Sequence, residues 1–268
     1  VAAETEEQAE AAMRALKVDY EVMGFAVTTE ASMAKDAPKV GNERQDNVIP
    51  IKRRRESDSK AEDRWAEQKA VTDKAFKKSK HVVEGKFGTQ VQVHNALETH
   101  GVLCHWEGDS ITIYASTQGT FSCIGQATST RGPVAAANAR VIAEYIGGGF
   151  GAKFGLGREG VAAAVLAKMS KRPVHLMLNR REEQTDAGNR PDSIQELKLG
   201  VDAKGKITAL SAHNWGTAGA GSRGAGARNQ VIYNIPDGFL DKKEYAVRTN
   251  CGGARAMRAP GFPQGVFA

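Results

Sequence analysis

The spacing of apolar residues divides the chain into a short opening helix, a long polar stretch and a strand-rich remainder. Apolar residues recur at helical spacing over 5–16, where Thr5 begins a potential capping box. They alternate over 18–22, which is typical of a strand. Because one helix and one strand cannot make a domain, we expect 1–23 to be the end of a preceding domain. Residues 24–80 are polar and weakly periodic, so they predict a charged connector that contains one helix, at 63–78.

From residue 82 onward, short alternating segments interrupted by glycines predict strands and few helices. The expected strands are 82–93, 110–116, 139–146, 174–178, 194–201, 207–214 and 246–249. A helix is expected at 159–169, directly after a glycine-rich segment. Helices and strands do not alternate regularly here, so the pattern predicts an α+β fold with mixed β-sheets and few helices.

Composition narrows the class of protein. The 268 residues suffice for one large domain or two modest ones, and the 29 glycines exceed the usual share of about 7%. Much of the net charge of +6 falls in 52–80, where a solvated face is expected rather than a nucleic-acid surface. Aromatic residues make up only 6%, which also argues against a nucleic-acid partner.

Cysteine usage and terminal sequence bear on the cellular context. Cys104, Cys123 and Cys251 lie far apart, which argues against a disulfide framework and a cysteine-ligated cluster. A reducing compartment is therefore expected, the cytoplasm first, with the periplasm left open. No apolar run of about 20 residues predicts a membrane span. The chain begins at Val1 without a signal-like segment, so we expect an internal fragment of a longer protein.

The glycine-rich segment 147–155, GGGFGAKFG, is the strongest local signal. Between a strand and a helix, small residues allow successive N–H groups to face one point, which suits an anionic or oxo ligand. A tight turn that binds nothing is the structural alternative. A Walker A phosphate loop is excluded, because Ala152 precedes Lys153 and Phe154 follows it.

A dinucleotide-binding fingerprint also fits this segment. Gly147, Gly149 and Ala152 match G-x-G-x-x-G/A, and Arg180 at the end of the next strand suits a 2′-phosphate. An NADP-binding Rossmann-type dehydrogenase is therefore the local alternative. The glycine-broken strands that follow argue against it, because a doubly wound sheet alternates strands and helices.

Five ordered blocks together resemble a known family. They are TQVQVHNALETHG at 89–101, ASTQGTF at 115–121, the glycine segment, RPVHLMLNRREE at 172–183 and RTNCGGARAMRAPGFPQ at 248–264. The chain is thereby identified as similar to the large, molybdenum-binding subunit of the molybdenum hydroxylases, the xanthine dehydrogenase and aldehyde oxidoreductase family. In that resemblance 1–23 is the end of the α/β hammerhead domain, and 81–268 is an incomplete first molybdenum-cofactor-binding domain.

The resemblance implies an oxidoreductase that hydroxylates an electron-poor carbon with oxygen from water. The implied cofactor is molybdenum with molybdopterin, in the cytosine dinucleotide form of bacterial relatives. The implied partners are an iron–sulfur subunit or domain carrying [2Fe-2S], an FAD subunit or domain, and the remainder of the large subunit. A non-catalytic structural fragment is the other alternative.

The same resemblance assigns site residues. The implied cofactor contacts are Gln92, Gly148, Gly149, Phe150, Gly151, Ala152, Arg258 and Ala259. Among these, Gln92, Phe150 and Arg258 are expected beside the molybdenum ligands. Gln92 is the expected side-chain donor to the apical oxo group, and the N–H groups around Phe150 are the expected backbone donors.

Phe154 and Arg223 are the expected substrate-side residues. Purine-oxidising members carry a glutamate where this chain has Phe154, so an aldehyde or an aromatic heterocycle is expected in place of xanthine. The family's general base is a glutamate expected beyond residue 268, so no catalytic residue is assigned here and the isolated chain is expected to be inactive. His94 and Glu98 resemble a metal pair, but without a third ligand a structural role is expected.

Overall fold

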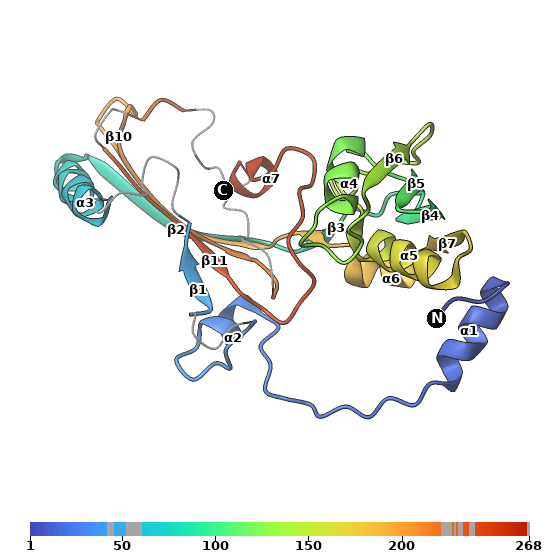
Figure 1. Cartoon of the computed structure of the whole chain (residues 1–268). Coiled ribbons are helices and arrows are strands. Elements are labelled where there is room, and N and C mark those ends of the chain that lie inside the picture. Colours follow the sequence, from blue (N-terminus) through green and yellow to red (C-terminus); the bar gives the residue numbers. More distant parts are fainter. Residues whose placement is uncertain are drawn as a thin grey trace. The chain divides into compact units, whose positions relative to one another are not determined.

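The structure is a computed structural model that describes residues 1–41, 46–51, 61–220, 227, 229, 233–235 and 239–266, with the side chains of 61–64 left aside. The chain forms two compact units. Figure 1 colours the chain along its sequence, from blue at the N-terminus to red at the C-terminus. Unit 1 comprises Val1–Met23 and Val93–Gly188, and unit 2 comprises Gly24–Gln92 and Asn189–Ala268.

Unit 1 is built on a four-stranded sheet. Its order is β6 (Asn138–Ile142), β5 (Ser110–Ala115), β4 (Gly101–Glu107) and β7 (Val174–Met177). Strand β4 runs antiparallel to both of its neighbours, and β5 runs parallel to β6. The helices that belong to this unit are α1 (Glu6–Ala15), α4 (Thr120–Ala127), α5 (Gly157–Ser170) and α6 (Arg180–Asp186).

The core of unit 1 lies between this sheet and α5. Ile111 and Ile113 of β5 are buried, as are Ala163, Ala164 and Ala167 of α5. Alanines at helical spacing give α5 a narrow apolar face, so its backbone can approach the sheet closely. This packing fixes the point at which the chain leaves β6 and enters α5.

Unit 2 is built on a five-stranded sheet. Its order is β1 (Val48–Pro50), β11 (Leu240–Val247), β10 (Ile207–Thr217), β9 (Ser193–Val201) and β2 (His81–Thr89). Strands β10 and β11 are parallel, and the other pairs are antiparallel. The remaining elements are α2 (Thr29–Met33), α3 (Ala61–Lys78), β8 (Asn189–Arg190) and α7 (Phe262–Gly265), while β3 (Gln92–Val93) crosses the unit boundary. Figure 1 shows α3 lying beside the end of this sheet.

The α+β class with mixed sheets and few helices is confirmed, and so are most of the predicted elements. The N-cap Thr5 accepts a hydrogen bond from the Gln8 N–H, as the capping pattern predicts. The predicted strand at 18–22 is wrong: these residues are exposed, and no described strand pairs with them. A strand without a partner leaves its backbone hydrogen bonds unmade, so alternation alone does not produce one.

The stretch 24–80 differs from a simple connector. Strand β1 pairs with β11, and Trp65 of α3 donates a hydrogen bond of 2.8 Å to the buried Asp241. Ala75 and Phe76 of the same helix pack on Ala209 of β10. Trp65, Ala75 and Phe76 of α3 thus face the sheet of unit 2, although the helix as a whole is polar.

The topology contradicts the Rossmann alternative. A dinucleotide-binding βαβ unit places the strand after the helix parallel to and beside the strand before it. Here the chain passes from β6 through the glycine segment and α5 to β7, and β5 and β4 separate β7 from β6. Separately, none of the helices in the described ranges is long and apolar enough to cross a membrane.

Candidate functional site

The glycine segment forms a tight loop between β6 and α5 in unit 1. Its backbone is left-handed at Gly148 (φ 97°), Phe150 (φ 51°) and Gly151 (φ 109°). For a residue with a side chain, such as Phe150, this conformation costs roughly 1–2 kcal/mol. Strain of this kind persists only where surrounding contacts fix the backbone, and it concentrates at binding sites.

Two glycines of the loop allow close approach to neighbouring segments. A Cβ on Gly149 would lie 2.4 Å from the side-chain oxygen of Gln118, and a Cβ on Gly147 would lie 2.4 Å from the Cβ of Glu98. Both distances are far below a van der Waals contact. Glycine is therefore required at these two positions by packing.

Gln118 is the side chain that lies against this loop. Its Oε1 accepts a hydrogen bond of 2.8 Å from the Gly151 N–H, and its own N–H donates to the Lys153 carbonyl at 2.7 Å. Because an N–H group can only donate, the amide oxygen faces Gly151 and the amide NH₂ group points elsewhere. None of the described residues accepts from the Gln118 NH₂ group, so this group is a free side-chain donor beside the loop.

The first part of the loop carries N–H groups without a partner. None of the residues that the structure describes accepts a hydrogen bond from the N–H of Gly148, Gly149 or Phe150. The Gly151 N–H, expected from the sequence to face the ligand, is instead occupied by Gln118. Three successive amide donors are thus available to an acceptor outside the chain.

A partly buried ion pair closes the base of the loop. Lys153 has no exposed surface, and its ammonium donates to the Glu98 carbonyl (2.8 Å), the Glu98 Oε2 (3.1 Å) and the Ser116 Oγ (2.6 Å). Glu98 Oε2 also accepts from the Gly147 N–H at 2.6 Å. Burial alone would raise the pKa of Glu98, but the hydrogen bonds from Ser116, Gly147 and Lys153, with the Lys153 charge, hold it below its usual range.

No group of three or more His, Cys, Asp or Glu residues that could hold a metal ion occurs in the part of the chain that the structure describes. The Glu98 carboxylate accepts hydrogen bonds from Lys153 and Ser116, and its structural role stays a prediction.

Two aromatic rings stand exposed on the loop. Phe150 is 48% exposed and Phe154 is 53% exposed, so neither is part of the core. A Cβ on Gly119 would lie 3.5 Å from the Phe154 ring, which places this ring beside the start of α4. The substrate-side role of Phe154 stays a prediction.

The other predicted site residues belong to unit 2. Gln92 is an exposed residue of β3, and Arg258 and Ala259 are also exposed. The backbone of the latter pair is held by Arg190, whose Nη2 donates to the Arg258 carbonyl at 2.6 Å, and Ala259 is left-handed (φ 54°). Arg223 lies outside the described residues.

The structure thus gathers the loop, Gln118 and Phe154 in unit 1. The sequence did not single out Gln118, although the STQ block contains it.

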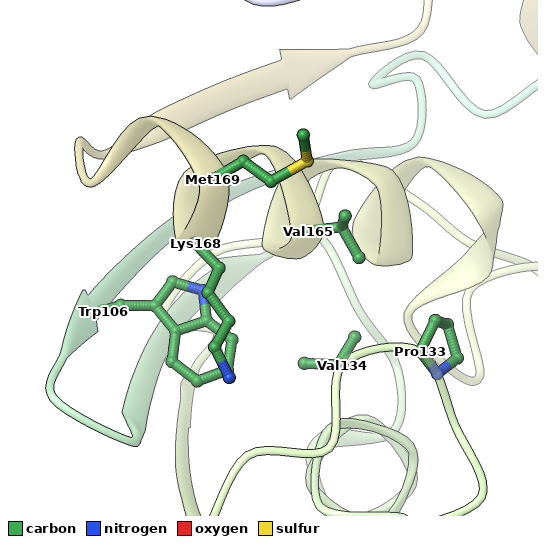
Figure 2. A pocket seen from close by; sticks show the side chains of 6 residues that line it. All are labelled: Trp106, Pro133, Val134, Val165, Lys168 and Met169. Carbon is green, nitrogen blue, oxygen red and sulfur yellow. The ribbon is translucent and has the colours of Figure 1, made fainter.

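Unit 1 also contains a shallow apolar cavity of about 220 Å³. It is lined by Trp106, Pro133, Val134, Val165, Lys168 and Met169, and Figure 2 shows the Lys168 side chain extended along the Trp106 ring. The Lys168 ammonium lies 4.5 Å from the centre of that ring. No predicted site residue lines this cavity, so it is separate from the loop site.

Known proteins share the sequence and the fold. Residues 55–268 match the molybdopterin cofactor-binding domain family. The aldehyde oxidoreductase molybdenum-binding subunit PaoC of Escherichia coli (strain K12) is 32% identical over 198 residues, which are 73% of this chain and 27% of that protein. The nicotinate dehydrogenase large molybdopterin subunit of Eubacterium barkeri is 26% identical over 274 residues, covering 98% of this chain and 60% of that protein. The aldehyde oxidoreductase of Desulfovibrio gigas has the same fold, with a TM-score of 0.78 at 23% identity, over 99% of this chain and 28% of that one.

Proposed function

This chain belongs to the molybdopterin cofactor-binding domain family of the molybdenum hydroxylases, and we propose that its glycine loop and Gln118 hold the oxo end of a molybdenum cofactor. The observation that carries the proposal is the row of unpartnered N–H groups at Gly148, Gly149 and Phe150. Oxo and phosphate oxygens are strong acceptors, and preorganised backbone donors are the groups that bind them.

The residues present fit such a group. Gly148 and Gly149 carry no side chain over the donors, and the backbone of Phe150 is held in the left-handed conformation. The NH₂ group of Gln118 adds a neutral donor, so the site can bind an oxo oxygen without placing a positive charge beside it. The fully buried Lys153 ammonium donates to Glu98 and Ser116.

Gln118 is proposed as a further side-chain donor to the oxo group, in addition to the predicted donor Gln92. It lies in the same unit as the loop and accepts a hydrogen bond from the Gly151 N–H. Gln92 remains the predicted side-chain donor to the apical oxo group. Arg258 and Ala259 remain predicted contacts beside the pterin, and Arg223 remains a predicted substrate-side residue.

The proposed reaction of the whole protein is hydroxylation of an aldehyde or an aromatic heterocycle with oxygen from water. The molybdenum cofactor, in the cytosine dinucleotide form, supplies the oxygen-transfer and two-electron chemistry. Phe154 offers an apolar ring to a planar substrate at the place where a purine would require a carboxylate. The names of the two relatives, which refer to an aldehyde and to nicotinate, support this substrate class.

The partners proposed are an iron–sulfur module with [2Fe-2S], an FAD module and the rest of the large subunit. The chain spans about a quarter of the length of the Escherichia coli relative, so these assignments concern a larger assembly. The three thiols, all free, suit a cytoplasmic location.

The test is metal and pterin analysis of the native complex captured through this chain. About one molybdenum per chain, with cytidine monophosphate released on acid hydrolysis, is expected. A complete and folded complex that contains no molybdenum contradicts the proposal and favours a structural role for the chain.

A further inference from the structure

Lys153 is the one buried ammonium described in the loop, and the contact proposed for the cofactor does not use it. An ammonium has three N–H donors, and the Glu98 carbonyl, the Glu98 carboxylate and Ser116 accept all of them. Lys153 therefore has no donor left for a ligand. Any effect it has on a bound group must act through the residues that it holds.

Glu98 connects the first residue of the loop, Gly147, to Lys153. The Glu98 carboxylate that binds Lys153 also accepts from the N–H of Gly147, the first residue of the loop, and the Glu98 N–H donates to the Gly147 carbonyl at 3.2 Å. One carboxylate thus holds the loop at its first residue and at its lysine. The five residues between Gly147 and Lys153 include the three positions of the loop that have positive φ, which are Gly148, Phe150 and Gly151.

The backbone of Lys153 fixes the same point from another side. Its carbonyl accepts from the Gln118 N–H (2.7 Å) and from the Thr117 Oγ1 (2.9 Å). Side chain and backbone together connect the loop to the segment that contains Ser116 and Gln118. Movement of Lys153 would therefore displace both groups of donors, those of the loop and that of Gln118.

We propose that Lys153, with Glu98 and Ser116, is a positioning residue that sets the loop conformation in which the Gly148, Gly149 and Phe150 N–H groups face the cofactor. This inference rests on the proposed function for its last step only. The loop conformation itself is a property of this chain and can be measured without the cofactor.

The test is hydrogen exchange by mass spectrometry on the full-length protein in its native complex, with Lys153→Met. Amide exchange over 147–153 is expected to accelerate about tenfold or more, while amides of α5 stay within about twofold of the parent protein. Molybdenum content is expected to fall below about half of the parent value. Lys168→Met is the matched control, because it removes an exposed lysine of the same unit and leaves the loop untouched.

Ser116→Ala provides a milder variant in case Lys153→Met does not fold. It removes one acceptor of Lys153 and one donor to Glu98 and leaves the ion pair in place. Unchanged exchange over 147–153 in a folded variant overturns the inference. Faster loop exchange with full molybdenum content supports the role of Lys153 in the loop and contradicts the proposed cofactor contact.

Discussion

The side-chain oxygen of Gln118 accepts a 2.8 Å hydrogen bond from the N–H of Gly151. This single contact orients the amide, since only the oxygen can face a donor. It also explains why residue 149 must be glycine, because the same oxygen occupies the space that a Cβ there would need. The polar end of one glutamine thus determines both the shape of the loop and the direction of a free donor.

Replacing Gln118 with glutamate tests that donor. A carboxylate still accepts from the Gly151 N–H, but it has no NH₂ group and brings a negative charge toward an oxo oxygen. Turnover of the native complex is expected to fall about 10²-fold, which is the effect of losing one preorganised donor to a developing oxyanion. The thermal midpoint is expected to change little, and kinetics with calorimetry measure the two effects separately.

Gln126→Glu is the matched control for that substitution. Gln126 Oε1 accepts from the Leu156 N–H at 2.8 Å, so it makes the same kind of contact at the other end of the loop. The control is expected to retain parent turnover. Equal losses in the two variants would assign the effect to added charge and remove the donor role from Gln118.

Gly149→Ala is expected to destabilise the loop. The new Cβ would lie 2.4 Å from the Gln118 side-chain oxygen, so the glutamine must move and release Gly151. The cost expected from overpacking is about 1–3 kcal/mol, measured as a lower free energy of unfolding in urea. Molybdenum content should fall with it.

Gly125→Ala is the opposite case within the same unit. Gly125 lies inside α4, and a Cβ there meets nothing within 4 Å. Alanine is expected to stabilise the helix by about 0.5–1 kcal/mol. If both alanine substitutions shift stability in the same direction, the close approach at Gly149 is not what makes glycine necessary there.

The three cysteines are expected to differ in reactivity. Cys104 and Cys123 are fully buried, and burial raises the pKa of Cys104 to about 12 and also raises that of Cys123. Cys251 is exposed. Alkylation of the folded chain at pH 8, followed by peptide mass spectrometry, should modify Cys251 first. Rapid modification of Cys104 without unfolding would contradict the packing of β4.

Local signals in the sequence were sufficient for the loop and its flanking elements. The glycines at 147–149 and the helical spacing after 157 predict a strand, a tight loop and a helix, which the structure contains as β6, the loop and α5. The order of short glycine-broken strands likewise predicts mixed sheets. These features depend on residues that are close together in the chain.

Features that depend on distant partners were not predictable in this way. Strand β4 has neighbours on both edges and buries residues of both faces, so its pattern does not alternate and no strand is predicted there. The role of Gln118 depends on a hydrogen bond to a residue 33 positions away. Residues 18–22 alternate without a described partner strand, and the pattern there predicts a strand that is absent.

Glu98→Gln is expected to change how the stability of the chain depends on pH. The folded-state pKa of Glu98 lies below its ordinary value of 4.5, so its stabilising contribution is fully present above pH 4.5 and is lost as the pH falls through the lower folded-state value. The parent chain should therefore lose stability as the pH falls below about 4.5. The glutamine variant should lose less over the same range while being less stable at pH 7, because Lys153 then lacks its carboxylate. Thermal midpoints measured from pH 7 to pH 3 give both quantities, with Glu107→Gln as the exposed control at the end of β4. Parallel pH profiles for the parent chain and the Glu98 variant would show that this carboxylate titrates as it does in the unfolded chain, and the ion pair at the base of the loop would then contribute nothing to stability at neutral pH.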